Sequence, residues 1–114
     1  MPRSDLTVQP ITVAGVEPTY EAANGDGNAF LNRGRTFLHV KNGGGGPCTV
    51  TAITPITVGG RAVADDDFVI PASEERMIGP FSADIFNNSG ADVNKVHVDY
   101  STAASVTVAA FFLP

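Results

Sequence analysis

Cysteine, tryptophan and basic residues are scarce in this 114-residue chain, and each shortage argues against a class of function. The single cysteine, Cys48, excludes an intrachain disulfide and cannot build a zinc ribbon. We interpret it as a small buried apolar residue on a strand. Tryptophan is absent and only two tyrosines are present. Sugar-binding modules usually stack sugars on such rings, so carbohydrate binding is disfavoured.

Positive charge is also in short supply. Seven basic residues stand against twelve acidic ones, which gives a formal net charge of −5. Binders of nucleic acid or of anionic membranes need clustered Lys and Arg, and here these residues are scattered. We therefore expect neither partner. No apolar run reaches the roughly 18 residues of a membrane span. No apolar segment follows Met1, so we expect no secretory signal and synthesis in a cytoplasm.

The residues that are abundant favour strands. Val, Thr, Ile, Phe and Tyr number 38, whereas the straight-chain helix formers Leu, Glu, Lys, Gln and Met number 13. Gly and Pro add 20 chain breakers, and turn signals recur about every eight to twelve residues. The sequence therefore predicts a single all-β domain, an antiparallel β-sandwich or jelly-roll-like fold of eight or nine short strands. Jelly-roll and immunoglobulin-like strand orders both stay open.

Alternating apolar residues mark the expected strands. In residues 36–42, Leu38 and Val40 should face the core, and the same pattern recurs in residues 47–54, 95–101 and 104–112. The glycines of residues 43–46 are interpreted as a flexible hairpin loop. Residues 80–86 are the only helix-like segment, with Ser82 as a candidate cap and with Ile85 and Phe86 packing inward.

The N-terminal part differs from the rest because prolines interrupt it at Pro2, Pro10 and Pro18. We interpret residues 1–19 as an extended arm and residues 20–114 as the sandwich domain. The arm could dock on its own domain or on a neighbour. The chain ends on bulky apolar groups, which are normally held in a core or at a subunit contact. The predicted interface residues are Ile11, Val13, Val16, Phe111, Phe112 and Leu113.

No motif points to catalysis, and we predict a protein that is not an enzyme and needs no cofactor. His39 and His97 are the only imidazoles. Pairing of their strands could bring them together with Asp99 as a transition-metal site, although two ordinary surface histidines are the simpler interpretation. The acidic turns at Asp26 and at residues 65–67 could hold a hard cation, but solvated loops are favoured.

From Phe30 onward the chain resembles the small decoration, or cement, proteins of tailed-phage heads. The most specific segment is Ile78-Gly79-Pro80-Phe81, which precedes Val96-His97-Val98-Asp99-Tyr100-Ser101. The resemblance implies a β-sandwich without catalytic residues that binds the major capsid protein on the outside of the virion. It also implies a homotrimer. Residues 1–19 have no counterpart in it.

Two other classes of function stay open from the sequence. One is a different phage structural component, such as a tail, connector or head-fibre protein. The other is a β-sandwich module that binds a small ligand or a carbohydrate through the loops around Asp26 and residues 65–67.

Overall fold

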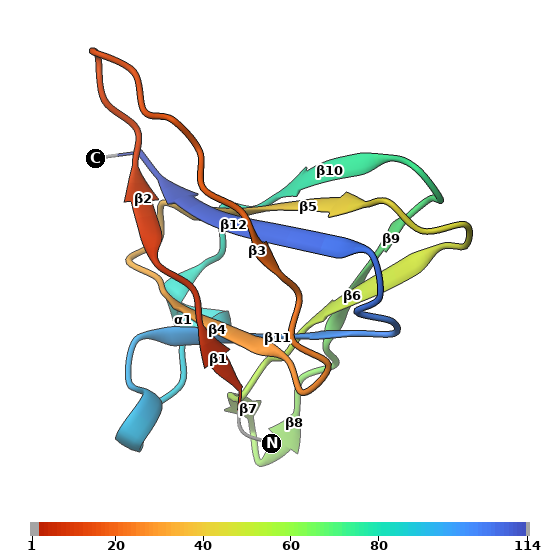
Figure 1. Ribbon diagram of the computed structural model, residues 1–114. Coiled ribbons are helices and arrows are strands. Elements are labelled where there is room, and N and C mark those ends of the chain that lie inside the picture. Colours follow the sequence, from red (N-terminus) through yellow and green to blue (C-terminus); the bar gives the residue numbers. More distant parts are fainter. Residues whose placement is uncertain (1–2, 114) are drawn as a thin grey trace.

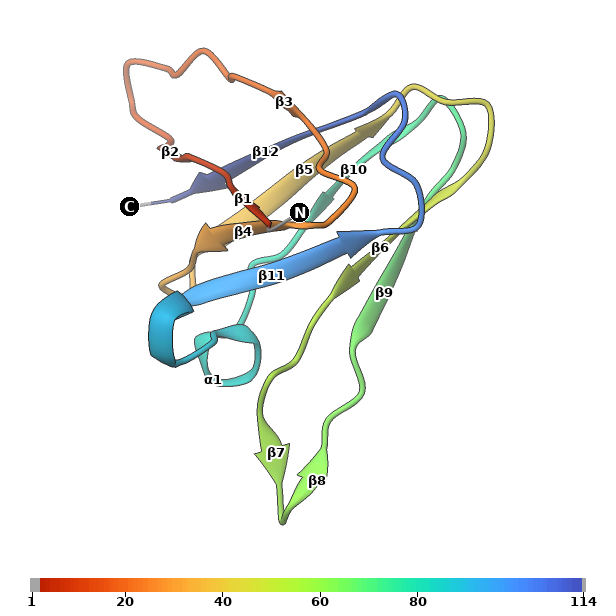
Figure 2. The ribbon, with the colours of Figure 1, turned by 60° about the horizontal axis from the view of Figure 1, so that its bottom comes forward.

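The computed structural model describes residues 3–113 and is built almost wholly of strands, arranged as two packed sheets (Figures 1 and 2). The first sheet has the order β1 (Ser4–Asp5), β4 (Asn28–Leu31), β11 (Lys95–Tyr100), β6 (Cys48–Ala52) and β9 (Asp66–Ile70). The second has the order β10 (Glu75–Ile78), β5 (Thr36–Asn42), β12 (Val106–Phe112) and β2 (Val8–Pro10), and β3 (Glu21–Ala22) also pairs with β12. The predicted all-β sandwich is confirmed, but the described residues form twelve strands rather than eight or nine, because five of them span only two or three residues.

Side-chain alternation explains why these strands stack into two layers. On β5, Leu38 and Val40 are fully buried, while Phe37 and Lys41 on the other face stay partly exposed. The same alternation buries one face of β6, β11 and β12. Successive side chains of a strand point to opposite faces, so each strand can turn its apolar row inward. The predicted inward faces of these four strands are confirmed.

The sheets are mixed rather than purely antiparallel. Pairings among the seven strands of four or more residues are all antiparallel, whereas β1 runs parallel to β4 and β2 runs parallel to β12. The antiparallel expectation therefore holds for the body of the sandwich but not for its N-terminal additions. The reason is that β1 and β2 pair with strands that are not joined to them by a hairpin, so an antiparallel direction is not imposed.

The predicted hairpin at residues 43–46 is wrong. This segment crosses from β5 in one sheet to β6 in the other, and the two strands do not pair. Asn42 organises the crossing: its Nδ2 donates to the carbonyl oxygens of Gly46 (2.9 Å) and Ile70 (3.0 Å), and its Oδ1 accepts from the Gly44 amide (3.0 Å). A buried side chain thus replaces the turn bonds that a hairpin would make.

The β6–β9 pair continues beyond the sandwich as a narrow two-stranded extension. Its outer part is β7 (Thr57–Val58) and β8 (Arg61–Ala62), joined by Gly59 and Gly60, which both have positive φ. Two such residues form the turn that suits the twist of a two-residue hairpin. We call residues 57–62 the ribbon; Figure 2 shows it pointing away from the two sheets.

The helix-like segment is one short turn. The helix α1 (Ala83–Phe86) is followed by a 3₁₀ turn at Gly90–Asp92. Phe86 packs inward against Phe81, with ring centroids 5.4 Å apart. Two details differ from expectation: Ser82 makes no side-chain cap bond, and Ile85 is 38% exposed.

Candidate interaction surface

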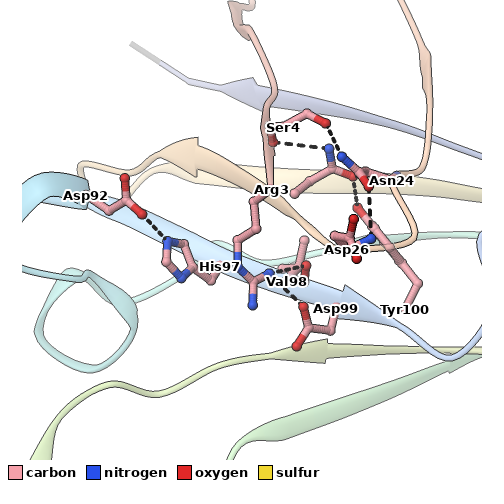
Figure 3. Close-up of polar contacts among 10 residues, drawn as sticks. Arg3, Ser4, Asn24, Asp26, Asp92, His97, Val98, Asp99 and Tyr100 are labelled. Atoms are coloured by element: carbon pink, nitrogen blue, oxygen red, sulfur yellow. Dashed lines mark hydrogen bonds and ion pairs between the residues drawn. The ribbon is translucent and has the colours of Figure 1, made fainter. Parts of the chain in front are cut away.

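Residues 3–6 are anchored to the first sheet (Figure 3). Arg3 Nη1 lies 2.6 Å from Asp99 Oδ1 and donates to the Val98 carbonyl at 3.0 Å. The Leu6 amide donates to the Ala29 carbonyl (2.8 Å), and the Leu6 side chain is only 5% exposed in the core. Of the predicted arm 1–19, residues 3–10 therefore belong to the sandwich of this same chain.

Residues 11–19 leave the sandwich as a protruding segment that we call the projecting loop (Figure 1). Its base is closed by Gln9, whose Nε2 donates to the Thr19 carbonyl (2.8 Å) and whose Oε1 accepts from the Thr19 amide (2.9 Å). The Ile11 amide donates to the Phe112 carbonyl at 3.0 Å. These bonds imitate one pair of strand hydrogen bonds and hold the two ends of the loop together.

The tip of the projecting loop is a tight turn. The Gly15 amide donates to the Thr12 carbonyl (3.0 Å), and Thr12 Oγ1 donates to the Gly15 carbonyl (3.1 Å). Gly15 has φ +93°, a conformation that suits glycine. The turn holds Val13 entirely in solvent and leaves Val16 38% exposed. A single exposed valine is common on protein surfaces, so Val13 counts toward a contact surface only together with the other apolar side chains at this end of the molecule.

Tyr20 fastens the returning end of the loop to the outside of the second sheet. Its hydroxyl lies 2.7 Å from His39 Nδ1, and its ring meets the ring of Phe111 edge-on at 6.3 Å. Lys41 Nζ lies 4.0 Å above the Tyr20 ring, and His39 Nε2 lies 2.7 Å from Glu75 Oε1. Sequence reasoning missed Tyr20, because no local pattern links residue 20 to a strand that begins at residue 36.

The two histidines do not meet. His39 lies on β5 and His97 on β11, and these strands belong to different sheets with their imidazoles on outward faces. His97 Nε2 pairs with Asp92 Oδ2 at 2.8 Å, and Asp99 pairs with Arg3 (Figure 3). Within residues 3–113, no group of three or more His, Cys, Asp or Glu side chains is placed to hold a metal ion.

The acidic loops carry structural hydrogen bonds. Asp65 Oδ1 accepts from the Thr54 amide (2.9 Å) and hydroxyl (3.2 Å) where the ribbon leaves the sandwich, and Asp67 Oδ1 accepts from Thr51 Oγ1 (2.8 Å). Cys48 is fully buried, and its thiol donates to the Thr102 carbonyl at 3.3 Å, which confirms its interpretation as a buried strand residue.

Burial keeps the second tyrosine, Tyr100, in its neutral form. The Tyr100 hydroxyl donates to Asn28 Oδ1 at 2.7 Å. Burial raises the pKa of the Tyr100 phenol well above its ordinary value; the nearby Cys48 and Asp99 raise it further, and Arg3 opposes them. The neutral phenol is therefore a structural donor and is unsuited to acid–base chemistry near neutral pH.

The six predicted interface residues gather at one end of the molecule, with different accessibility. Val13 and Val16 are on the projecting loop, and Ile11 is half-buried at its base. Leu113 is 53% exposed and Phe112 is half-buried. Phe111 is 5% exposed, because Tyr20 and Phe37 cover it, so it supports the loop from beneath.

A groove of about 390 Å³ opens beside the base of the projecting loop. Apolar residues form most of its wall, together with two arginines and one threonine. The lining residues are Val8, Leu31, Arg33, Arg35, Thr36, Phe112 and Leu113. The structure thus joins the chain end predicted as a contact surface to the β4–β5 connection, which sequence reasoning did not single out.

Fold and surface together define a β-sandwich with two projections. Comparison with known proteins returned no matching family model, no matching curated protein and no matching solved structure. The resemblance to phage decoration proteins therefore stays a prediction from the sequence. In residues 3–113, no helix combines the length and the apolar character needed to cross a bilayer.

Proposed function

We propose that the protein is a virion structural protein that binds the outer surface of a tailed-phage capsid and stabilises it as a homotrimer. The observation that carries the proposal is the pair of projections at opposite ends of the sandwich, each with an exposed valine (Figures 1 and 2). Val13 is fully exposed on the projecting loop, and Val58 is 65% exposed on the ribbon.

A trimer on a capsid needs two kinds of contact, one with its own copies and one with the lattice. Burying one exposed valine contributes roughly 1.5–3 kcal/mol at most. A single contact of this size is weak, but three linked copies convert it into durable attachment. We assign the ribbon to the contact with the capsid. We assign the end of the molecule that carries the projecting loop to the contact between copies.

The ribbon suits a docking role because its shape is set before binding. Gly59 and Gly60 make a tight turn, and Thr54 holds the base through Asp65 and through the Val63 carbonyl, which accepts from Thr54 Oγ1 at 2.6 Å. A segment already ordered in its bound shape loses less entropy on binding. The major capsid protein is the proposed partner.

The test mixes purified protein with undecorated capsids and measures the amount that co-sediments. Val58→Asp should weaken capsid binding by about tenfold or more, since a carboxylate would replace the buried apolar contact. Met77→Asp is the matched control, because Met77 on β10 is also 65% exposed. It should bind like the wild type.

Failure of the wild type to bind at micromolar concentration would contradict the capsid function. Equal loss of binding in both variants would contradict the assignment to the ribbon. The number of copies per particle in solution separates a decoration protein from a connector or tail component, because a ring of six or more copies favours the latter.

A further inference from the structure

The groove beside the projecting loop combines apolar walls with positive charge that has no partner in the described chain. Arg33 and Arg35 are exposed, and neither makes an ion pair with a carboxylate of residues 3–113. Their neighbours in the wall include Leu31, Phe112 and Leu113. In a protein of net charge −5, such a groove selects an occupant that offers apolar side chains next to a carboxylate.

The projecting loop has that chemistry. Val16 is directly followed by Glu17, and Val13 stands at the turn. Glu17 is exposed, and its side chain makes no hydrogen bond or ion pair within the described part of the chain. The loop therefore offers two apolar side chains and one carboxylate, which complement the apolar wall and the positive charge of the two arginines.

The loop does not fill the groove of its own chain. It starts beside the groove, where the Ile11 amide is bonded to the Phe112 carbonyl. Both ribbon views then show it extending away from the sandwich (Figures 1 and 2). The Gln9–Thr19 bonds and the seat of Tyr20 on the second sheet hold it in that direction.

We propose that the occupant of the groove is the projecting loop of a second copy of this chain, with Glu17 of one copy facing Arg33 and Arg35 of the next. Loop and groove are different patches of one surface, so the contact is head-to-tail, and the proposed trimer needs a threefold rotation between copies that closes it into a ring. The proposal rests on the trimer of the proposed function and names its contact.

Charge reversal followed by rescue tests this contact. Light scattering after size exclusion gives the oligomeric state of the full chain over a range of concentrations. Glu17→Arg, and separately the double variant Arg33→Glu with Arg35→Glu, should weaken self-association by about tenfold or more, because each places like charges together. The triple variant that combines all three changes restores opposite charges and should reassemble like the wild type.

Two controls separate this effect from misfolding and from net charge. The three side chains are exposed, so all variants should melt at the wild-type temperature when each is diluted until the wild type is monomeric, where association no longer adds stability. Asp84→Arg changes the net charge as Glu17→Arg does, but its exposed carboxylate lies on α1, outside the groove lining. It should leave self-association unchanged.

A wild type that stays monomeric up to about 1 mM would overturn the proposal, and so would a triple variant no better than Glu17→Arg. If Asp84→Arg weakened assembly equally, net charge rather than the groove would be responsible, which also overturns it. Capsid binding is measured separately, so a ring that fails to bind capsids contradicts only the capsid function.

Discussion

The projecting loop and the ribbon both hold a valine clear of the sandwich, but different bonds keep them in shape. The loop, residues 11–19, has no strand pairing along its length and depends on side chains, chiefly the Gln9 amide at its base and Thr12 at its turn. The ribbon, residues 57–62, is an antiparallel backbone pair around Gly59 and Gly60.

This difference predicts how sensitive the shape of each projection is to substitution. Backbone pairing forms with almost any side chain, so the ribbon shape should tolerate substitution outside its glycines. A side-chain clamp needs one residue type at one position, so the loop shape should fail when Gln9 changes. The loop is also continuous with strands that help to form the core, whereas the ribbon extends a hairpin.

The largest effect should come from the strand segment that leads into the loop. Leu6→Ala removes a core side chain and should lower the free energy of unfolding by roughly 2–5 kcal/mol. Val13→Ala, in the loop itself, should change it by less than about 0.5 kcal/mol. Chemical denaturation measures both. Equal unfolding midpoints would show that residues 3–10 are no part of the sandwich.

That expectation revises what the sequence suggested for residues 1–19. Treated as an arm, they could be removed without loss of the fold. With Leu6 in the core and β1 and β2 paired to the two sheets, removal of residues 1–10 should destabilise the protein. Only residues 11–19 are expected to be dispensable for folding.

An intermediate effect should appear at alkaline pH, in the sandwich body rather than in either projection. The pKa of Tyr100 is raised in the folded protein, so the unfolded chain loses this proton first. The stabilisation is complete below about pH 10 and is lost as pH rises above it, by at most about 1.4 kcal/mol per pH unit. Tyr100→Phe should flatten this slope in denaturation measured from pH 9 to 11. An unchanged slope would show that Tyr100 is not the group responsible for the loss of stability at alkaline pH.

The smallest effects compare the two projections directly. Gln9→Ala should cost about 1 kcal/mol or less and speed amide hydrogen exchange in the projecting loop severalfold, without change in the ribbon. Gly60→Ala places a side chain at φ +79°, which should cost about 1 kcal/mol of stability. It should speed exchange in the ribbon and leave the projecting loop unchanged. Exchange measured by mass spectrometry on both variants reports each segment. If either variant loosened both segments, the projections would be coupled.

The sequence was informative where a signal is local. Alternation in residues 36–42 and 95–101 correctly showed which side chains face the core. The sequence misled at residues 43–46. Its glycine run predicts a hairpin, but the segment crosses between the two sheets. A flexible run permits both outcomes, and the choice depends on Asn42 reaching the distant Ile70 carbonyl.

The candidate interaction surface likewise contains some residues that the sequence predicted and others that only the structure revealed. Ile11, Val13 and Leu113 were selected because apolar residues in a proline-interrupted segment or at a chain end need a partner. Arg33, Arg35 and Tyr20 were not selected. Their roles arise only because the β4–β5 connection lies beside the chain end, and because β3 and β5 both pair with β12.

By itself, the sequence determined the all-β class and the inward row of each main strand, because a two-residue period acts within one strand whatever its partner. The tertiary structure alone decided which strands pair, that the first ten residues include core and sheet positions, and that an apolar groove with two arginines opens beside the projecting loop. Those features depend on contacts between residues far apart in the chain, and a local pattern carries no record of them.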